Sequence, residues 1–246
     1  MNVTLKVWRQ KNASTPGKLV EYKLNDLDPD MSFLEMFDVL NGQITRNGEE
    51  MIAFDHDCRE GICGSCSMFV NGRPHGPQTG GAICQLYMRS FKDGDTIVVE
   101  PWRARGFPII KDLSTDRAAF DRIVQAGGYI SVNTGSAPEA NEILVSREIQ
   151  ETTMDAAACI ACGACVAACK NASAMLFVSA QVSRFALLPQ GQSERRQRAE
   201  RMVAQMDAEG FGACSFTGAC AVECPASVSL ENITRLNREY LGAKIR

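Results

Sequence analysis

The number and spacing of the cysteines constrain this chain more than any other feature of its sequence. The 246 residues contain eleven cysteines, one group near the first third of the chain and two runs in its second half. A secreted disulfide framework normally has an even number of cysteines in a shorter chain. Residues 1–6 also lack the charged and then apolar pattern of a signal peptide. We therefore expect an intracellular, reduced chain whose cysteines bind metal or do redox work.

Composition and charge exclude several classes of protein. Hydrophobic residues make up 45% of the chain and charged residues 22%, which is ordinary for a globular protein of one or two domains. A net charge of −3 gives no basic footprint for nucleic acid. The most apolar stretch, residues 172–188, is interrupted by polar side chains and is too short to span a bilayer. We expect a chain that does not itself cross a membrane.

The first cysteine group has the spacing of plant-type 2Fe–2S proteins. Three of its members follow the pattern C-x4-C-x2-C and the fourth lies much later in the chain: Cys58, Cys63, Cys66 and Cys84. Gly61 and Gly64 lie inside this loop, where a backbone without Cβ atoms can wrap closely and turn its amides toward sulfur. The alternative is a zinc site, but zinc sites normally pair two C-x2-C units or add histidines. We therefore predict a 2Fe–2S cluster here.

The remaining seven cysteines form an imperfect repeat. Both copies follow C-x2-C-x2-C-x3-C, but the second has Thr217 at its second position and Pro225 directly after its last: Cys159, Cys162, Cys165 and Cys169, then Cys214, Cys220 and Cys224. In two-cluster proteins with this spacing, the fourth cysteine of each run ligates the other cluster. This rule predicts one 4Fe–4S site made by Cys159, Cys162, Cys165 and Cys224. It assigns Cys169, Cys214 and Cys220 to a second site.

Thr217 decides what the second of these sites holds. A neutral hydroxyl is a hard, weakly acidic donor and a poor replacement for thiolate. A cluster at this place would therefore have one corner without a protein sulfur, and we predict a 3Fe–4S cluster. The alternative is a 4Fe–4S cluster with water or hydroxide on its fourth iron.

The periodicity of apolar residues divides the chain into a sheet half and a helical half. Alternating residues predict strands at 3–7, 19–24, 51–54, 67–70 and 95–100. A capping box of Ser32 and Glu35 starts a helix that Asn41-Gly42 is expected to end. Helical spacing returns in the second half, at 116–125, 193–208 and 229–240. We expect an α+β chain with a sheet domain at 1–105, a connector at 106–116 and a helical domain at 117–246.

Because of these motifs, the chain resembles the iron–sulfur subunits of succinate dehydrogenase and fumarate reductase. The resemblance covers essentially the whole chain. It is carried by CREGICGSC at 58–66, PIIKDL at 108–113, and both cysteine runs in order with Thr217 at the gap. Each motif also occurs in other proteins, but the ordered set is highly specific. It implies an N-terminal β-grasp 2Fe–2S ferredoxin-like domain and a C-terminal α-helical two-cluster ferredoxin-like domain.

The resemblance also implies partners and a direction of electron flow. A flavoprotein subunit with covalent FAD would oxidise succinate, and this chain, without catalytic residues of its own, would relay electrons through its three clusters. Quinone would be reduced near the 3Fe–4S cluster, at a membrane anchor subunit of the cytochrome b type that carries the haem. The chain would be peripheral, on the cytoplasmic face of a bacterial membrane. Alternatives are the reverse relay of a fumarate reductase, a free multi-cluster ferredoxin, and a zinc-stabilised scaffold.

Two departures from the common mitochondrial and proteobacterial pattern bear on the quinone. The segment between Cys66 and Cys84 is longer, and Lys170-Asn171-Ala172 follows Cys169 in place of a proline and a tryptophan pair. Residues 170–177 and 187–192 look more like the branch that uses menaquinone and a di-haem anchor. The resemblance therefore implies menaquinone and assigns no quinone contacts.

Three further groups of residues have a structural and a functional interpretation. Arg59 is expected to be solvated or to dock the flavoprotein. Four arginines of the segment 193–208 are expected to form a solvated face or to contact anionic lipid: Arg195, Arg196, Arg198 and Arg201. Residues 175–178 are expected to be core or to pack against a membrane anchor. Neither histidine, His56 or His75, fits a Rieske or haem pattern, and both are expected to be ordinary polar residues.

Overall fold

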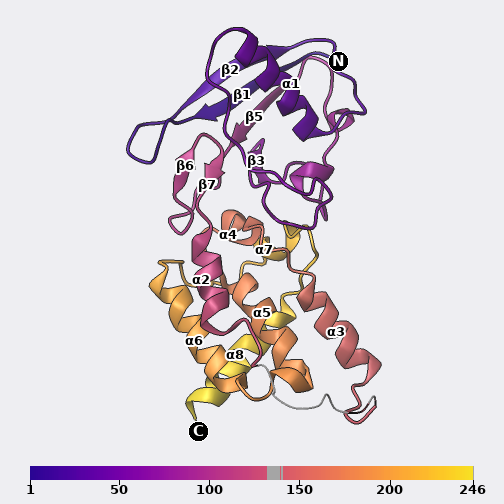
Figure 1. Ribbon diagram of the computed structural model, residues 1–246, viewed down its shortest axis with the longest axis vertical. Helices are drawn as coiled ribbons and strands as arrows, with labels where there is room; N and C mark the ends of the chain where they lie inside the picture. The colour runs from indigo at the N-terminus through magenta and orange to yellow at the C-terminus, as the bar shows by residue number, and fades with distance from the viewer. Residues whose placement is uncertain (132–138, 140, 246) are drawn as a thin grey trace.

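The structure is a computed structural model that describes residues 1–131, 139 and 141–245. A sheet part and a helical part are stacked along the long axis of the molecule, with the chain termini at opposite ends (Figure 1). The sheet part contains the N-terminal half of the chain, and the helical part contains the rest. The expected domain 117–246 includes residues 132–138, 140 and 246, which lie outside the described residues.

The sheet part is built on a mixed sheet of five strands in the order β2-β1-β5-β3-β4. The strands are β1 Val3–Arg9, β2 Lys18–Leu24, β3 Phe69–Val70, β4 Arg73–Pro74 and β5 Thr96–Glu100. β1 pairs antiparallel with β2 and parallel with β5. Val3, Leu5 and Val7 alternate into the core along β1, as period-2 spacing predicts. The strands expected near 3–7, 19–24 and 95–100 are confirmed, and the one expected at 67–70 is shortened to β3.

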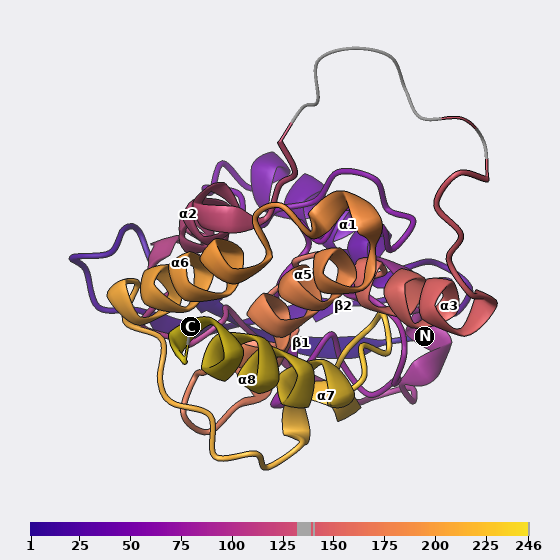
Figure 2. The same ribbon diagram turned by 90° about the horizontal axis from the view of Figure 1, so that it is seen from below.

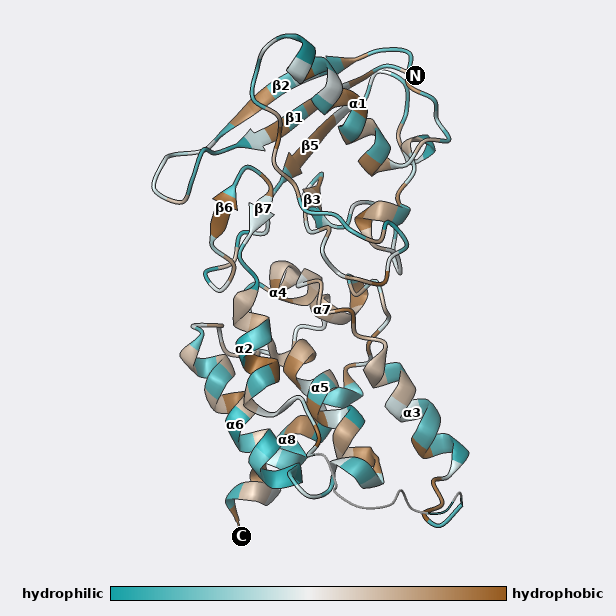
Figure 3. Cartoon of the chain, in the orientation of Figure 1, coloured by the Kyte–Doolittle hydropathy of each residue, from teal (hydrophilic) through white to brown (hydrophobic). Residues whose placement is uncertain are grey.

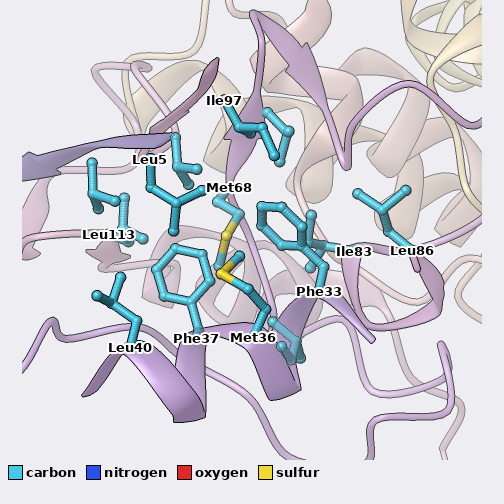
Figure 4. Packing of buried hydrophobic residues seen from close by; sticks show 14 of the residues in the cluster. Leu5, Phe33, Met36, Phe37, Leu40, Met68, Ile83, Leu86, Ile97 and Leu113 are labelled. Carbon is cyan, nitrogen blue, oxygen red and sulfur yellow. The ribbon is translucent and has the colours of Figure 1, made fainter. Parts of the chain in front are cut away.

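Helix α1 (Phe33–Arg46) covers one face of this sheet. Its N-terminus has the predicted capping box, because the Ser32 hydroxyl accepts from the Glu35 amide (3.2 Å) and the Glu35 carboxylate accepts from the Ser32 amide (2.6 Å). Apolar side chains of the helix pack against the sheet in Figure 4, among them Phe33, Met36, Phe37 and Leu40 against Leu5 of β1, Ile97 of β5 and Met68, which precedes β3. Each such burial contributes about 1.5–3 kcal/mol.

Two expectations about the next segment are wrong. The helix does not end at Asn41-Gly42 but continues to Arg46, because Ile44 is buried and extends the apolar stripe by another turn. Residues 51–54 form no strand. The Asn41 amide accepts from the Ile52 N–H (2.8 Å) and donates to the Ile52 carbonyl (3.0 Å). The main-chain groups of this segment are thus satisfied by a side chain instead of a neighbouring strand.

The connector is more ordered than its composition predicts. It contains a short hairpin of β6 (Ile109–Lys111) and β7 (Ser114–Thr115), turned at Asp112, whose φ is 47°. The buried Asp112 carboxylate accepts from the Arg9 guanidinium (3.1 Å) and from the amides of Gln10 (2.9 Å) and Ala53 (2.9 Å). One carboxylate therefore fastens the hairpin to the sheet part.

The helical part is organised around α5. Its helices are α2 Ala118–Gly127, α3 Arg147–Ala157, α4 Ala164–Ala168, α5 Met175–Leu187, α6 Arg195–Ala208, α7 Ala219–Val222 and α8 Glu231–Lys244. Short 3-10 turns occur at Ile83–Gln85, Met88–Ser90 and Pro189–Gly191. Helices α3, α6 and α8 pack around α5 (Figure 2). Among the described residues, no helix is long and apolar enough to cross a membrane.

Residues 175–178 belong mainly to the core. Leu176, Phe177 and Val178 are buried, and the Phe177 ring stacks on Phe120 with centroids 3.8 Å apart. These three side chains are packed within the chain, so the expectation that they cover a membrane anchor is wrong, whereas for the half-buried Met175 it stays a prediction. Aromatic stacking of this kind adds to the stability that burial already provides.

The arginines of α6 do not form one solvated face. Figure 3 shows the helix as mostly hydrophilic, yet the side chain of Arg198 is fully buried. Its guanidinium donates to the carbonyls of Gly127 (2.8 Å), Gly191 (2.7 Å) and Tyr129 (2.8 Å). Charged side chains are buried only when they are paired in this way. Arg196 and Arg201 are exposed as expected, and Arg195 forms an ion pair with Glu239 (2.6 Å).

Candidate iron–sulfur sites

The four cysteines of the first group come together at the lower edge of the sheet part. Cys58, Cys63 and Cys66 lie on one irregular loop, and Cys84 lies on the 3-10 turn Ile83–Gln85. Cys66 and Cys84 are buried and hydrogen-bonded to each other, and the Cys58 thiol is hydrogen-bonded to Cys63. Cys63 alone of the four is exposed. The long segment between Cys66 and Cys84 therefore folds back on itself, and the two cysteines at its ends are adjacent.

The surroundings favour thiolate, the form that ligates metal, at Cys84 and Cys63, and the neutral thiol at Cys66. The hydrogen bond from the Cys66 thiol lowers the pKa of Cys84 to about 6, and the same pairing, together with burial, raises the pKa of Cys66. Burial acts to raise the pKa of Cys63, but hydrogen bonds from the Ser65 hydroxyl and from Cys58 lower it to about 7. The Ser65 oxygen lies 3.1 Å from the Cys63 sulfur.

Two glycines let the first loop fold this closely. Gly61 (φ 76°) directs its amide to the Cys84 sulfur, and a Cβ there would lie 2.5 Å from the Gln85 side chain. A Cβ on Gly64 (φ 70°) would lie 2.1 Å from the Ile160 carbonyl oxygen. Only glycine fits both the left-handed conformation and the close approach. The first loop is thus in direct contact with the loop that carries the second group.

A second cavity collects four cysteines from both copies of the repeat. Its walls carry Cys159, Cys162, Cys165 and Cys224, together with apolar residues that include Phe120, Leu176 and Phe177. Burial raises the pKa of Cys162 to about 12 and raises that of Cys165 well above the usual range. Unligated thiols in such a place are neutral, and a bound metal would have to deprotonate them.

A third cavity collects the remaining three cysteines and Thr217. Its walls include Cys169 from the first copy, Cys214 and Cys220 from the second, and neighbouring residues such as Ser173 and Phe216. Cys214 and Thr217 are exposed, so this site lies nearer to the surface than the second one. The two cavities divide the seven cysteines in the way that the crossing rule predicts.

The two copies repeat in backbone conformation as well as in spacing. Three pairs of equivalent positions have positive φ: Ala161 and Phe216 (54° and 56°), Gly163 and Gly218 (88° and 80°), and Ala172 and Ser227 (50° and 52°). In each copy, the amide two residues after the first cysteine donates to that cysteine's sulfur, from Ala161 to Cys159 and from Phe216 to Cys214 (3.4 Å). Amides directed at sulfur are typical of iron–sulfur loops. These hydrogen bonds explain why Ala161 and Phe216 adopt the left-handed conformation although they are not glycine.

The donor sets fit clusters better than single ions. Within the part of the chain that the structure describes, no three Cys, His, Asp or Glu side chains converge on a point where one ion could bind. A zinc ion needs its sulfurs at about 2.3 Å from a single centre. Here the sulfurs are spread around the walls of cavities, and almost every donor is a cysteine sulfur, which is a soft ligand. This arrangement suits iron–sulfur clusters and disfavours the zinc alternative.

The three sites lie in a row. The first adjoins the second through Gly64 and Ile160, and the Ser67 hydroxyl donates to the Cys162 carbonyl (3.0 Å). The second adjoins the third through Leu176, whose side chain lines both cavities. The row has an exposed cysteine at each end, Cys63 and Cys214, and none at its centre.

Several residues that hold these loops were not predicted. The Trp102 indole donates to the Cys162 carbonyl (3.1 Å), and the Asn171 amide donates to the Ala213 carbonyl (2.8 Å) and the Ser215 hydroxyl (3.0 Å). His75, expected to be an ordinary polar residue, is buried against Trp102 and accepts from the Ile83 amide (3.2 Å). A tryptophan among charged residues just before the connector was the one signal in the sequence. The other contacts depend on distant parts of the chain.

Arg59 is not freely solvated but pairs with a neighbouring carboxylate. Its docking to a flavoprotein stays a prediction. Its guanidinium forms an ion pair with Asp38 of α1 (2.7 Å), with about a third of its side chain exposed. Surface pairs of this kind contribute about 0–1 kcal/mol.

Comparison with known proteins agrees with this geometry. Residues 4–122 match the family of 2Fe-2S iron-sulfur cluster binding domains, and residues 155–228 match the family of 4Fe-4S dicluster domains. The fumarate reductase iron-sulfur subunit of Wolinella succinogenes is 30% identical over 250 residues, covering 98% of each chain. The succinate dehydrogenase iron-sulfur subunit of Bacillus subtilis is 26% identical over 214 residues, covering 83% of this chain and 79% of that protein. A chain of the Mycobacterium smegmatis Sdh1 complex in the apo form has the same fold, with a TM-score of 0.66 at 20% identity over 100% of this chain and 98% of that one.

Proposed function

This chain belongs to the family of iron–sulfur subunits of succinate dehydrogenase and fumarate reductase, and we propose that it relays electrons between a flavoprotein and quinone. It is an electron-transfer subunit of an oxidoreductase, with a 2Fe–2S domain followed by a 4Fe–4S domain. In the succinate dehydrogenase direction, electrons from succinate would enter at the first site and leave at the third. The reverse direction, in a fumarate reductase, is the alternative, and the names of the relatives include both activities.

The ligand assignment is part of the proposal. The 2Fe–2S cluster would be held by Cys58, Cys63, Cys66 and Cys84, the 4Fe–4S cluster by Cys159, Cys162, Cys165 and Cys224, and the 3Fe–4S cluster by Cys169, Cys214 and Cys220. The observation that carries the assignment is the division of the seven later cysteines between two cavities, each of which takes cysteines from both runs.

The clusters would supply one-electron transfer, and the chain would supply their order and surroundings. Exposed cysteines at both ends of the row, Cys63 and Cys214, support exchange with partners at the ends. Buried Cys162 and half-buried Cys165 support an internal station between the two ends. The substrate chemistry would belong to the flavoprotein, as the family implies.

The partners follow from the family. We propose a flavoprotein with FAD beside the first site and a membrane anchor of the cytochrome b type, with haem, beside the third. The assembled complex would lie on the cytoplasmic face of a bacterial membrane, with quinone near the 3Fe–4S cluster. Menaquinone is the proposed quinone, because residues 170–177 lack the proline and tryptophans of the other branch.

Purification of the tagged chain from its native cells, in mild detergent without oxygen, tests this function. We expect FAD and haem proteins to copurify, and succinate–quinone activity to exceed quinol–fumarate activity when both are measured on the same sample. The opposite ratio would reverse the direction. A brown chain that elutes alone would be a free ferredoxin, and a colourless one would be a zinc protein.

A further inference from the structure

One cation joins the first and second cysteine loops. Arg117, which directly precedes α2, is half-buried at the junction of the two parts of the molecule. Its Nη1 group lies within hydrogen-bonding range of the carbonyl oxygens of Gly64, Ala161 (3.2 Å) and Cys162 (3.2 Å). Gly64 lies between two ligands of the first proposed cluster, and Cys162 is a ligand of the second. A single guanidinium thus contacts the backbone around both sites.

The backbone conformation explains why carbonyls gather at this point. Gly64 and Ala161 both have positive φ (70° and 54°). The Ala161 amide is directed inward to the Cys159 sulfur, while its carbonyl faces the junction. Carbonyl oxygens that converge from two loops repel one another unless a donor lies between them. Arg117 is that donor, and its planar guanidinium suits several acceptors at once.

The charge of Arg117 is not cancelled by an ion pair. In the described part of the chain, its hydrogen-bond partners are main-chain carbonyls and not carboxylates. Arginine stays protonated in proteins, so a full positive charge lies between the two loops. The charge lies close to the second site, because the guanidinium contacts the main-chain carbonyl of Cys162, one of its proposed ligands.

We propose that Arg117 is a positioning residue that holds the two loops together and raises the reduction potentials of the clusters they carry. A cluster becomes more negative when it is reduced, so a nearby uncompensated cation favours the reduced state. The inference rests on the proposed cluster assignment. It adds that one side chain shifts the potentials of two neighbouring clusters in the same direction.

Potentiometric titration of the intact complex, followed by electron paramagnetic resonance, tests this role. Arg117→Met removes the charge, and Arg117→Lys keeps it with a different hydrogen-bonding geometry. The matched control is Arg122→Met on α2, where the exposed arginine pairs with the Glu209 carboxylate (2.7 Å) instead of with carbonyls of the cysteine loops. We expect Arg117→Met to lower both midpoint potentials, changing the ratio of oxidised to reduced cluster at a fixed potential by roughly tenfold. Arg117→Lys should recover most of that shift.

The proposal is overturned if Arg117→Met leaves both potentials at the values of the Arg122→Met control, or if Arg117→Lys shifts them as far as Arg117→Met. If Arg117→Met does not retain its clusters, Arg117→Gln carries the same test, because it loses the charge but keeps two amide donors. The wild-type spectra separate this test from the proposed function. Absence of 2Fe–2S and 4Fe–4S signals there would refute the cluster assignment itself, before any variant is compared.

Discussion

The two copies of the cysteine run have nearly the same backbone and different surroundings. Equivalent residues share their left-handed conformations to within a few degrees at Ala161 and Phe216. At the second cysteine position, however, Cys162 is buried and its carbonyl receives donors from the sheet part, while Thr217 is exposed. The conformation of the loop is therefore independent of the ligand at this position. The copy that contacts the sheet part has a cysteine at this position, and the copy at the surface has a threonine.

The largest expected effect comes from replacing Cys162, the cysteine that contacts the sheet part. Cys162→Ala takes one proposed sulfur ligand from the second site and leaves the main-chain contact with Ser67 in place. We expect loss of the 4Fe–4S cluster and failure of the helical part to fold stably, because cluster binding and folding are coupled. Iron and sulfide content and the reduced 4Fe–4S resonance measure this.

The matched change in the other copy is Thr217→Ala. Its hydroxyl is exposed and is not a proposed ligand, so all three clusters should remain. Equal losses of iron in Cys162→Ala and Thr217→Ala would show that the two positions contribute equally to cluster binding. That result would contradict the difference between the two copies.

An intermediate effect is expected at the glycine that follows each of these positions. A Cβ on Gly163 would lie 2.9 Å from Phe107 and 3.1 Å from Trp102, whereas the nearest atom to one on Gly218 is 3.6 Å away, on Leu230. Both glycines have positive φ, so alanine costs about 1–2 kcal/mol at either position. Overpacking should add about 1–3 kcal/mol at Gly163 alone.

Thermal loss of cluster absorbance ranks these two variants. Gly163→Ala should have the lower midpoint, with Gly218→Ala between it and the wild type. Equal midpoints would mean that the sheet part does not press on the first copy as the structure describes.

The smallest expected effect is at Asn171, which holds the surface copy. Asn171→Ala removes two hydrogen bonds to 213–215, each worth about 0.5–1.5 kcal/mol. The change should broaden the 3Fe–4S resonance or lower its occupancy and leave the signals of the other two clusters as they were. A change in the 2Fe–2S signal instead would place the effect far from the contact that the structure shows.

Prediction from the sequence succeeded where a structural feature depends on residues close to it in the chain, and failed where it depends on distant ones. The capping box at Ser32 and the alternation in β1 are set by neighbours in sequence, and both were predicted. The hairpin β6–β7 was missed because the Asp112 carboxylate, which holds it, has its partners around residues 9, 10 and 53. Arg198 looked solvated because its three carbonyl partners come from other segments.

Helix α3 was missed for a related reason. It begins at a Ser146 cap, but it is polar and buries only the small side chains of Thr153 and Ala156, so no stripe of large apolar residues marks it in the sequence. At the candidate sites, spacing alone predicted how the later cysteines divide between two cavities. It could not predict Trp102 or Arg117, whose contacts cross between the two parts. The ligand assignment itself stays a prediction.

The central claim is that Thr217 marks a three-iron corner in an otherwise repeated pair of sites. Electron paramagnetic resonance of the anaerobically purified protein and of Thr217→Cys tests it most directly. The oxidised wild type should show a 3Fe–4S signal, and Thr217→Cys should lose that signal and gain a second 4Fe–4S signal when reduced. An oxidised wild type without a 3Fe–4S signal, or a variant that keeps it unchanged, would contradict the account.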